Sequence, residues 1–186
     1  LAGNRIKEVI GILNGTTNYI LTKMSREGQP YEKVLQEAQA LGYAEADPTS
    51  DVEGFDAARK IAILASIAFN SRVTFEEVYV EGITRITPLD IKYGRELGYE
   101  IKLLAIAKEE EDGILVRVHP AFIPNDHPLA AVSGVYNAVF VRGDAVDDLM
   151  FYGRGAGQMP TASAVVGDLM EIVRNITRKD TGRISC

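Results

Sequence analysis

The residues from Asp56 to Asn70 restrict the fold more than any other stretch of the chain. Their second half includes IAILASIAF, which is apolar nearly all round a helix. A helix of that kind is normally buried on most of its sides. The sequence therefore predicts a core helix that other elements must cover.

The remaining elements are expected as helices early in the chain and strands late. Helical spacing and stop signals predict helices over about Thr17–Arg26 (ending at Gly28), Tyr31–Leu41, Thr87–Gly98 and Pro160–Ile176. Apolar runs and alternation predict strands over Ile6–Leu13, Ile101–Ala107, Ile114–His119, Val135–Arg142 and Val146–Tyr152. This order favours an α+β domain over a doubly wound one, because no βαβαβ series is present. Residues 177–186 are polar, and we expect a tail or linker there.

Composition and charge exclude several classes of function. The 186 residues are 46% hydrophobic and 25% charged, as in an ordinary soluble domain. The net charge of −6 argues against a nucleic-acid surface. The sequence contains no run of about 18 apolar residues, so we expect no membrane span. The start, LAGNRIKEV, has neither an initiator Met nor a signal-peptide core. We therefore expect a cytoplasmic chain that begins inside a larger protein.

Cysteine and histidine are too few to suggest metal or thiol chemistry. The single cysteine, Cys186, is the last residue, so no internal disulfide or cysteine cluster can form. A chain end is also too poorly ordered to aim a nucleophile. The two histidines, His119 and His127, each precede a proline and are expected in turns or at a strand end. We expect no metal site.

Asp56 and Lys60 are four residues apart and share one face of the predicted core helix. One interpretation is a surface salt bridge. The other is a partly enclosed ammonium, since the residues after Lys60 are apolar and Asp56 would keep the lysine charged. Such an ammonium can donate a proton to a carbonyl oxygen that receives a hydride. Spacing alone leaves both interpretations open.

Glu45, Asp47 and Asp51 fall in a loop that Pro48 interrupts. They could form a solvated acidic loop, a divalent-cation site, or a site for the ammonium or hydroxyl of a substrate. The spacing lacks the pattern of an EF-hand, which disfavours calcium.

Two loops lead into predicted helices. The Asn14–Asn18 turn offers free backbone amides that suit a carboxylate or phosphate, although an ordinary N-cap explains the same residues. The Gly153–Gly157 loop could admit a nucleotide closely. It departs from the G-x-G-x-x-G pattern, because Gln158 stands at the third glycine position.

The stretch from Ala38 to Lys60 resembles the signature of the homoserine dehydrogenase family. The matching positions are Ala38, Gly42, Tyr43, Ala44, Asp47, Pro48, Asp51, Val52, Gly54, Asp56 and Lys60. The GILNGTTNYIL and FYGRGAGQMPTASAVVGDL segments resemble the same family in the same order. The resemblance covers nearly the whole chain.

The resemblance implies an activity and a set of roles. Homoserine dehydrogenases interconvert aspartate β-semialdehyde and homoserine with NAD(P)H, on the shared route to threonine, methionine and isoleucine. By resemblance, Lys60 is the proton donor, Glu45 binds the amino acid, and Asp51 and the catalytic Asp56 line the pocket. Further substrate contacts correspond to Gly15, Thr16 and Tyr43, and Gly157 corresponds to a glycine beside the nucleotide.

The resemblance also implies a fold and a domain organisation. The fold would be a mixed β-sheet with helices packed on one face, similar to the C-terminal domain of glyceraldehyde-phosphate dehydrogenase. Residues 1–176 would form the catalytic and dimerisation domain of a homodimer, and most contacts to NAD(P) would come from a Rossmann domain before Leu1. The 160–176 helix would pack on that domain, and without it would expose an apolar stripe of Ala164, Val165, Leu169 and Ile172.

Two other interpretations remain open at this point. The chain could be a stand-alone amino-acid-binding or dimerisation module, or a dehydrogenase of another small semialdehyde. Aspartate semialdehyde dehydrogenase is disfavoured, because its chemistry needs a nucleophilic cysteine inside the chain. Without a hydride source, the chain alone is expected to be inactive.

Overall fold

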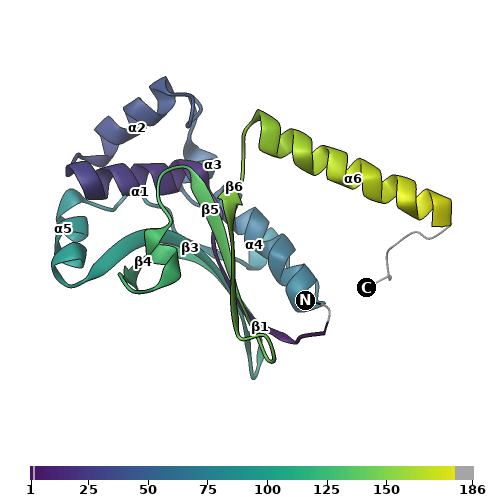
Figure 1. Cartoon of the computed structure of the whole chain (residues 1–186). Coiled ribbons are helices and arrows are strands. Elements are labelled where there is room, and N and C mark those ends of the chain that lie inside the picture. Colours follow the sequence, from purple (N-terminus) through teal and green to yellow (C-terminus); the bar gives the residue numbers. More distant parts are fainter. Residues whose placement is uncertain (2, 179–186) are drawn as a thin grey trace.

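A mixed, six-stranded sheet organises the computed structural model, which describes residue 1 and residues 3–178. The strand order is β2-β4-β3-β1-β5-β6, with β2 parallel to β4 and every other neighbouring pair antiparallel. Helices α1, α2, α4 and α5 lie on one side of this sheet (Figure 1). The predicted α+β fold, a mixed sheet with helices on one face, is confirmed.

The predicted elements are all present, with somewhat different ends. The strands are β1 (Ile6–Ile12), β2 (Tyr79–Val80), β3 (Tyr99–Glu110), β4 (Gly113–Pro124), β5 (Tyr136–Gly143) and β6 (Asp148–Arg154). The helices are α1 (Gly15–Glu27), α2 (Tyr31–Ala40), α3 (Thr49–Val52), α4 (Phe55–Ala68), α5 (Pro88–Glu96) and α6 (Gln158–Arg178), with 3-10 turns η1 (Phe75–Glu77) and η2 (Pro128–Ala131). Elements β2, α3, η1 and η2 were not predicted from the sequence.

Helix α1 begins and ends at residues that favour helix ends, Asn14 and Gly28. The Asn14 side chain accepts a hydrogen bond from the Thr17 N–H at 2.8 Å and so caps the first turn. At the other end, Gly28 adopts a φ of 65°, and its N–H bonds to the Met24 oxygen. Glycine reaches that left-handed conformation without a steric penalty, so the helix ends there.

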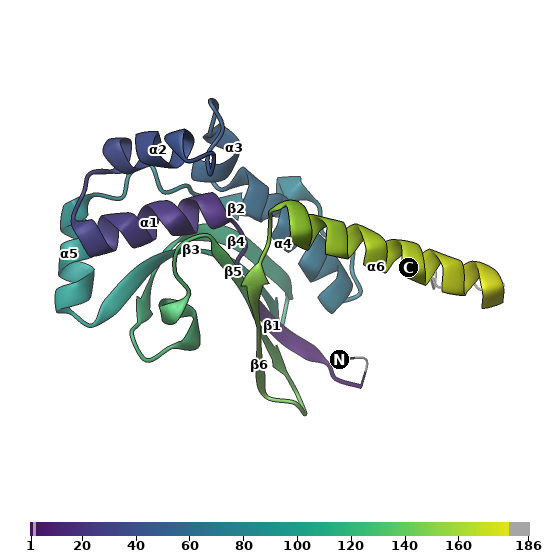
Figure 2. The same ribbon diagram turned by 45° about the horizontal axis from the view of Figure 1, so that its top comes forward.

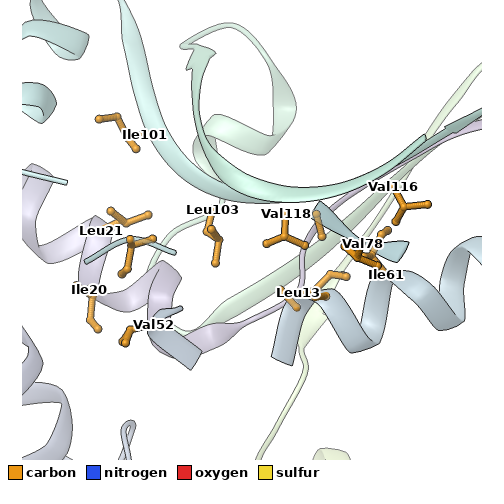
Figure 3. Close-up of a cluster of buried hydrophobic side chains, with 14 of the residues drawn as sticks. Leu13, Ile20, Leu21, Val52, Ile61, Val78, Ile101, Leu103, Val116 and Val118 are labelled. Carbon is orange, nitrogen blue, oxygen red and sulfur yellow. The ribbon is translucent and has the colours of Figure 1, made fainter. Parts of the chain in front are cut away.

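The main core lies between the sheet and the helices that cover it. Figure 3 shows Leu103 and Val118 of the sheet in the same cluster as Leu21 of α1 and Ile61 of α4, and all four side chains are buried. Each such burial contributes about 1.5–3 kcal/mol from apolar surface removed from water. This core fixes α1 and α4 relative to the sheet, and both helices carry residues of the candidate site.

A second, smaller core lies on the other face of the sheet. Successive residues of a strand point to opposite faces, so Leu104 points away from the face that Leu103 covers. Leu104 packs with Leu129 of η2 and Phe140 of β5 in a separate buried cluster. The 3-10 turn η2 therefore covers part of the face that the helices leave open.

The prediction that α4 is buried on most of its sides holds only in part. Its sheet-facing residues Ala58, Ile61 and Ala65 are fully buried, but Ile63 is 61% and Ile67 75% exposed. Along the second half of α4, Ala62 is also buried and the Ser66 hydroxyl bonds to Val73, so the side left open is the one that carries Ile63 and Ile67. An apolar hollow of about 360 Å³ beside it is lined in part by Ile67, Val139 and Val141.

Helix α6 extends away from the sheet in both views (Figures 1 and 2), and none of its residues is buried. The expected apolar stripe is exposed along it, at Ala164, Val165, Leu169 and Ile172. Thr177 and Arg178 belong to α6 rather than to a tail, and residues 179–186, with Cys186, lie outside the described residues. Over residues 1 and 3–178, no helix is both long and apolar enough to cross a membrane.

Candidate active site

A cavity of about 490 Å³ lies where segments far apart in the sequence meet. Its walls come from the start of α1, the turn after α2, the α3–α4 region, the start of β5 and the loop after β6. The lining residues are Asn14, Gly15, Thr16, Leu41, Gly42, Tyr43, Asp51, Asp56, Lys60, Val135, Asn137, Arg154, Gly155, Ala156 and Gly157. Seven of the eight site residues expected from the sequence line it; Glu45 is the exception.

Lys60 and Asp56 form a close pair on α4. The Lys60 Nζ donates to Asp56 Oδ2 at 2.6 Å and to the main-chain oxygen of Leu13 at 3.0 Å. The Lys60 side chain is 47% exposed and that of Asp56 29% exposed, so the pair is open at the cavity rather than enclosed. These two acceptors, one on α4 and one after β1, hold the ammonium at a defined place in the wall.

Asn14 joins the two aspartates of the site. Its Nδ2 donates to Asp51 Oδ1 at 2.8 Å and to Asp56 Oδ2 at 3.0 Å. Its Oδ1 accepts from the Thr17 N–H, so one buried side chain caps α1 and also bridges two carboxylates. From the sequence, Asn14 belongs to a turn that could cap a helix or offer backbone amides to an anion. Its bonds to Asp51 and Asp56 were not predicted, because the local pattern does not show which distant carboxylates it contacts.

Thr16, Tyr43 and Gly15 form the adjoining wall. The Thr16 hydroxyl donates to the Tyr43 main-chain oxygen at 2.7 Å, and the Tyr43 ring packs on Tyr19 with centroids 4.9 Å apart. A Cβ at Gly15 would lie only 2.9 Å from the main-chain oxygen of Val135. The start of α1 can therefore approach β5 this closely only because residue 15 is glycine.

Glu45 and Asp47 do not line the cavity. Glu45 is exposed, and its main-chain oxygen accepts from the Gln39 side chain at 3.0 Å. The hydroxyl and backbone N–H of Thr49 bond to the Asp47 carboxylate and lower its pKa. Asp47 thus stabilises the start of α3, and the substrate-binding role of Glu45 stays a prediction.

The end of β6 and the loop that follows it supply the remaining lining of the cavity. Gly157 has a φ of 120°, which L side chains rarely adopt, and a Cβ at Gly155 would meet the Asn137 amide at 2.8 Å. The Arg154 guanidinium lies over the Tyr136 ring, 5.2 Å from its centroid. A glycine backbone at this wall suits the close approach of a dinucleotide. The contributions of Asn137 and Arg154 were not predicted.

Within the described residues, no group of three or more His, Cys, Asp or Glu side chains is placed to hold a metal ion. His127 caps η2 by accepting from the Leu129 N–H at 3.2 Å. His119 lies inside β4 rather than at its end, because the strand continues past Pro120.

Comparisons with known proteins agree with this geometry. The sequence model of the family described as Homoserine dehydrogenase matches residues 1–170. The homoserine dehydrogenase of Synechocystis sp. is 57% identical over 184 residues, covering 97% of this chain and 42% of that protein. That of Bacillus subtilis is 54% identical over 182 residues, covering 98% of this chain and 42% of that protein.

Solved structures give the same result. A homoserine dehydrogenase from Thiobacillus denitrificans superposes with a TM-score of 0.96 and 52% identity, over 100% of this chain and 43% of that one. A hyperthermophilic archaeal homoserine dehydrogenase in complex with NADPH has a TM-score of 0.78 and 32% identity, over 92% of this chain and 48% of that one. The chain thus spans 42% of the length of the first two curated relatives. It belongs to the homoserine dehydrogenase family, whose members are oxidoreductases.

Proposed function

We propose that this chain is the substrate-binding and catalytic portion of an NAD(P)-dependent enzyme that interconverts L-aspartate 4-semialdehyde and L-homoserine. The observation that carries the proposal is the Lys60 ammonium, held 2.6 Å from Asp56 in a cavity that also contains Asp51. A cation for the reacting oxygen and carboxylates for an amino group are what this pair of substrates requires. Family membership supports the assignment.

Lys60 is proposed as the proton donor. When the aldehyde is reduced, negative charge develops on its oxygen, and an ammonium in contact with that oxygen stabilises the charge and transfers a proton. Asp56 and the Leu13 oxygen orient the ammonium, and its 47% exposure leaves it accessible from the cavity. In the reverse direction, neutral Lys60 would accept the hydroxyl proton of homoserine.

The two charged ends of the amino acid are proposed to bind on different walls. Asp51 and Asp56, joined by Asn14, suit the substrate ammonium. The free N–H groups at the start of α1, near Gly15 and Thr16, suit its α-carboxylate. Tyr43 lies beside them through its bond from Thr16. Glu45 is proposed to bind the amino acid on the strength of the resemblance alone, because its residue does not line the cavity.

The dinucleotide is proposed to approach along the loop of Gly155 and Gly157, with most of its contacts supplied by an upstream Rossmann domain. When bound, NAD(P)H would supply the hydride. The residues of this chain fit that approach, because the positive φ of Gly157 presents backbone rather than a side chain at the cavity. The loop and Lys60 border the same cavity, so cofactor and proton donor would flank one substrate.

We also propose the wider organisation that the resemblance implies. Residues 1–176 would be the catalytic domain of a cytoplasmic homodimer, acting in threonine, methionine and isoleucine biosynthesis. Helix α6 would pack on the nucleotide-binding domain. Helix α6 has no buried residue, and α4 exposes Ile63 and Ile67. These exposed apolar surfaces support the presence of a further domain that covers them.

The test is to join this chain to its native upstream segment and measure aspartate-semialdehyde-dependent oxidation of NADH and NADPH. The joined protein should be active and the chain alone inactive. Activity with another small semialdehyde, and none with aspartate semialdehyde, would contradict the substrate assignment. Tight binding of homoserine by the isolated chain in calorimetry, with no activity after joining, would support the alternative binding module.

A further inference from the structure

Lys102 of β3 is buried and forms no ion pair with any residue that the structure describes. Its residue surface is 3% exposed, and its Nζ donates to the Val132 main-chain oxygen at 2.5 Å and to Asn18 Oδ1 at 3.3 Å. Burial lowers the pKa of Lys102 to about 8, which the charge of Glu100 partly offsets. Placing an ammonium here costs free energy, since desolvation disfavours the charged form. Its hydrogen bonds connect β3 to α1 and to the residue that follows η2.

Asn18 lies one turn beyond Asn14 on α1 and is 2% exposed. Its Nδ2 donates to the Val132 oxygen at 3.3 Å and to the Tyr136 oxygen at 3.0 Å. Lys102 and Asn18 therefore share the Val132 oxygen as acceptor, and Lys102 also orients the Asn18 amide through Oδ1. Thr22, a further turn along α1, accepts from the Gly134 N–H at 3.1 Å.

The segment held by these bonds, residues 132–137, carries one wall of the cavity. Val135 and Asn137 line it. The Val135 oxygen is the group that would clash with a Cβ at Gly15, and the Asn137 amide is the group that would clash with one at Gly155. The position of segment 132–137 therefore sets the spacing between the start of α1 and the Arg154–Gly157 loop.

We propose that Lys102 and Asn18 are positioning residues for substrate binding: together they hold segment 132–137 against α1 and so set the width of the substrate cavity. The inference rests on the proposed function for the identity of the substrate. Neither side chain lines the cavity, and neither contacts Lys60, Asp56 or Leu13. The pair therefore acts on binding geometry and not on proton transfer.

The first test is Lys102→Met in the full-length enzyme. KM for homoserine should rise about tenfold while kcat changes less than about threefold, since the Lys60 contacts are unaffected. Lys102→Arg keeps the charge and the donors, and a neighbouring cavity of about 120 Å³ gives it room. This variant should restore KM to within about threefold of wild type. A Lys102→Met enzyme with unchanged KM would overturn the proposal.

Ser25→Ala is the matched control. Ser25 borders the same small cavity and is also buried, but its hydroxyl bonds to Glu100 and not to segment 132–137. KM should not change in this variant; the same rise as in Lys102→Met would attribute the effect to general loosening and overturn the proposal. If Lys102→Met does not fold, Asn18→Asp decides, because it is isosteric, keeps a partner for Lys102 and loses both donors to the segment. The Asn18→Asp variant should raise KM for homoserine, and an unchanged KM would refute the inference.

Hydrogen–deuterium exchange separates this inference from the proposed function. Lys102→Met should accelerate amide exchange in residues 132–137, and Ser25→Ala should not, whatever reaction the enzyme catalyses. Unchanged exchange in Lys102→Met would overturn the positioning role even in an active enzyme. Inactivity of the wild-type enzyme toward homoserine would refute the proposed function and leave the exchange result as the deciding measurement.

Discussion

Asn14 Nδ2 lies 3.0 Å from Asp56 Oδ2, the same oxygen that accepts from the Lys60 ammonium at 2.6 Å. Because Asn14 also bonds Asp51, the amide holds two carboxylates in one wall while the lysine neutralises one of them. A single buried asparagine at the start of α1 thus connects the lysine to both acidic positions of the site.

The first prediction concerns this bridge. Asn14→Ser keeps a side-chain oxygen to cap α1 but cannot reach both carboxylates, whereas Asn14→Ala loses the cap as well. Both variants should lower kcat/KM at least about tenfold, and only Asn14→Ala should also lose about 0.5–2 kcal/mol of stability. Kinetics and thermal unfolding of the two variants check this. Wild-type kcat/KM in Asn14→Ser would contradict the bridging role.

A second prediction concerns the close approach of α1 to β5. In Gly15→Ala the new methyl group would lie 2.9 Å from the Val135 oxygen, a backbone atom that cannot turn aside. The variant should lose about 1–3 kcal/mol of stability and raise KM. Gly167→Ala, in open space on α6, is the control and should gain about 0.5–1 kcal/mol. Equal stability changes in the two variants would exclude the steric explanation.

Lys102 makes stability depend on pH in the alkaline range. Its folded pKa of about 8 lies below the value of about 10.4 for an unfolded chain. Between these pH values the unfolded chain binds more protons, so the free energy of unfolding rises with pH. The full free-energy cost of burying the charged Lys102 is present below pH 8. Deprotonation at higher pH raises the free energy of unfolding by at most about 3 kcal/mol. Denaturant unfolding of wild type and Lys102→Met across this range should show wild type gaining relative to the variant; a constant difference would contradict it.

A fourth prediction concerns α6. Because none of its residues is buried, an isolated chain that ends at residue 157 should unfold within about 2 °C of the chain that carries α6. In the protein joined to its upstream segment, the same deletion should lower the unfolding midpoint clearly, because α6 is proposed to pack on the nucleotide-binding domain. Circular dichroism melts of the four proteins test this. No loss in the joined protein would argue against that packing.

The sequence predicted features that short-range patterns determine. The end of α1 at Gly28 and the presence of a helix over about Thr87–Gly98, observed as α5, follow from residues within a few positions. The Asp56–Lys60 pair follows from helical spacing. The resemblance of Ala38–Lys60 to the family signature predicted Asp51 and Tyr43 at the same site, and both residues line the cavity.

The features that were not predicted depend on partners far away in the chain. Asn14 meets carboxylates 37 and 42 residues later, and Lys102 meets an asparagine 84 residues earlier. The exposure of Ile67 on α4 could not be read from its apolar sequence, because the pattern shows an apolar surface without showing what covers it. The fold class and seven residues that line the cavity were thus predictable from the sequence, and the hydrogen bonds that hold them in place were not.

The most direct test of the proposed mechanism is the kcat of Lys60→Ala in the joined enzyme, with and without added primary amines. The account predicts a loss of about 10²–10⁴-fold, with partial recovery that rises with the concentration of the added alkylammonium ion. Lys92→Ala is the matched control, since Lys92 also pairs with a carboxylate four residues away but lies outside the cavity; it should keep wild-type kcat. A Lys60→Ala enzyme whose kcat stays within about threefold of wild type would contradict Lys60 as the proton donor.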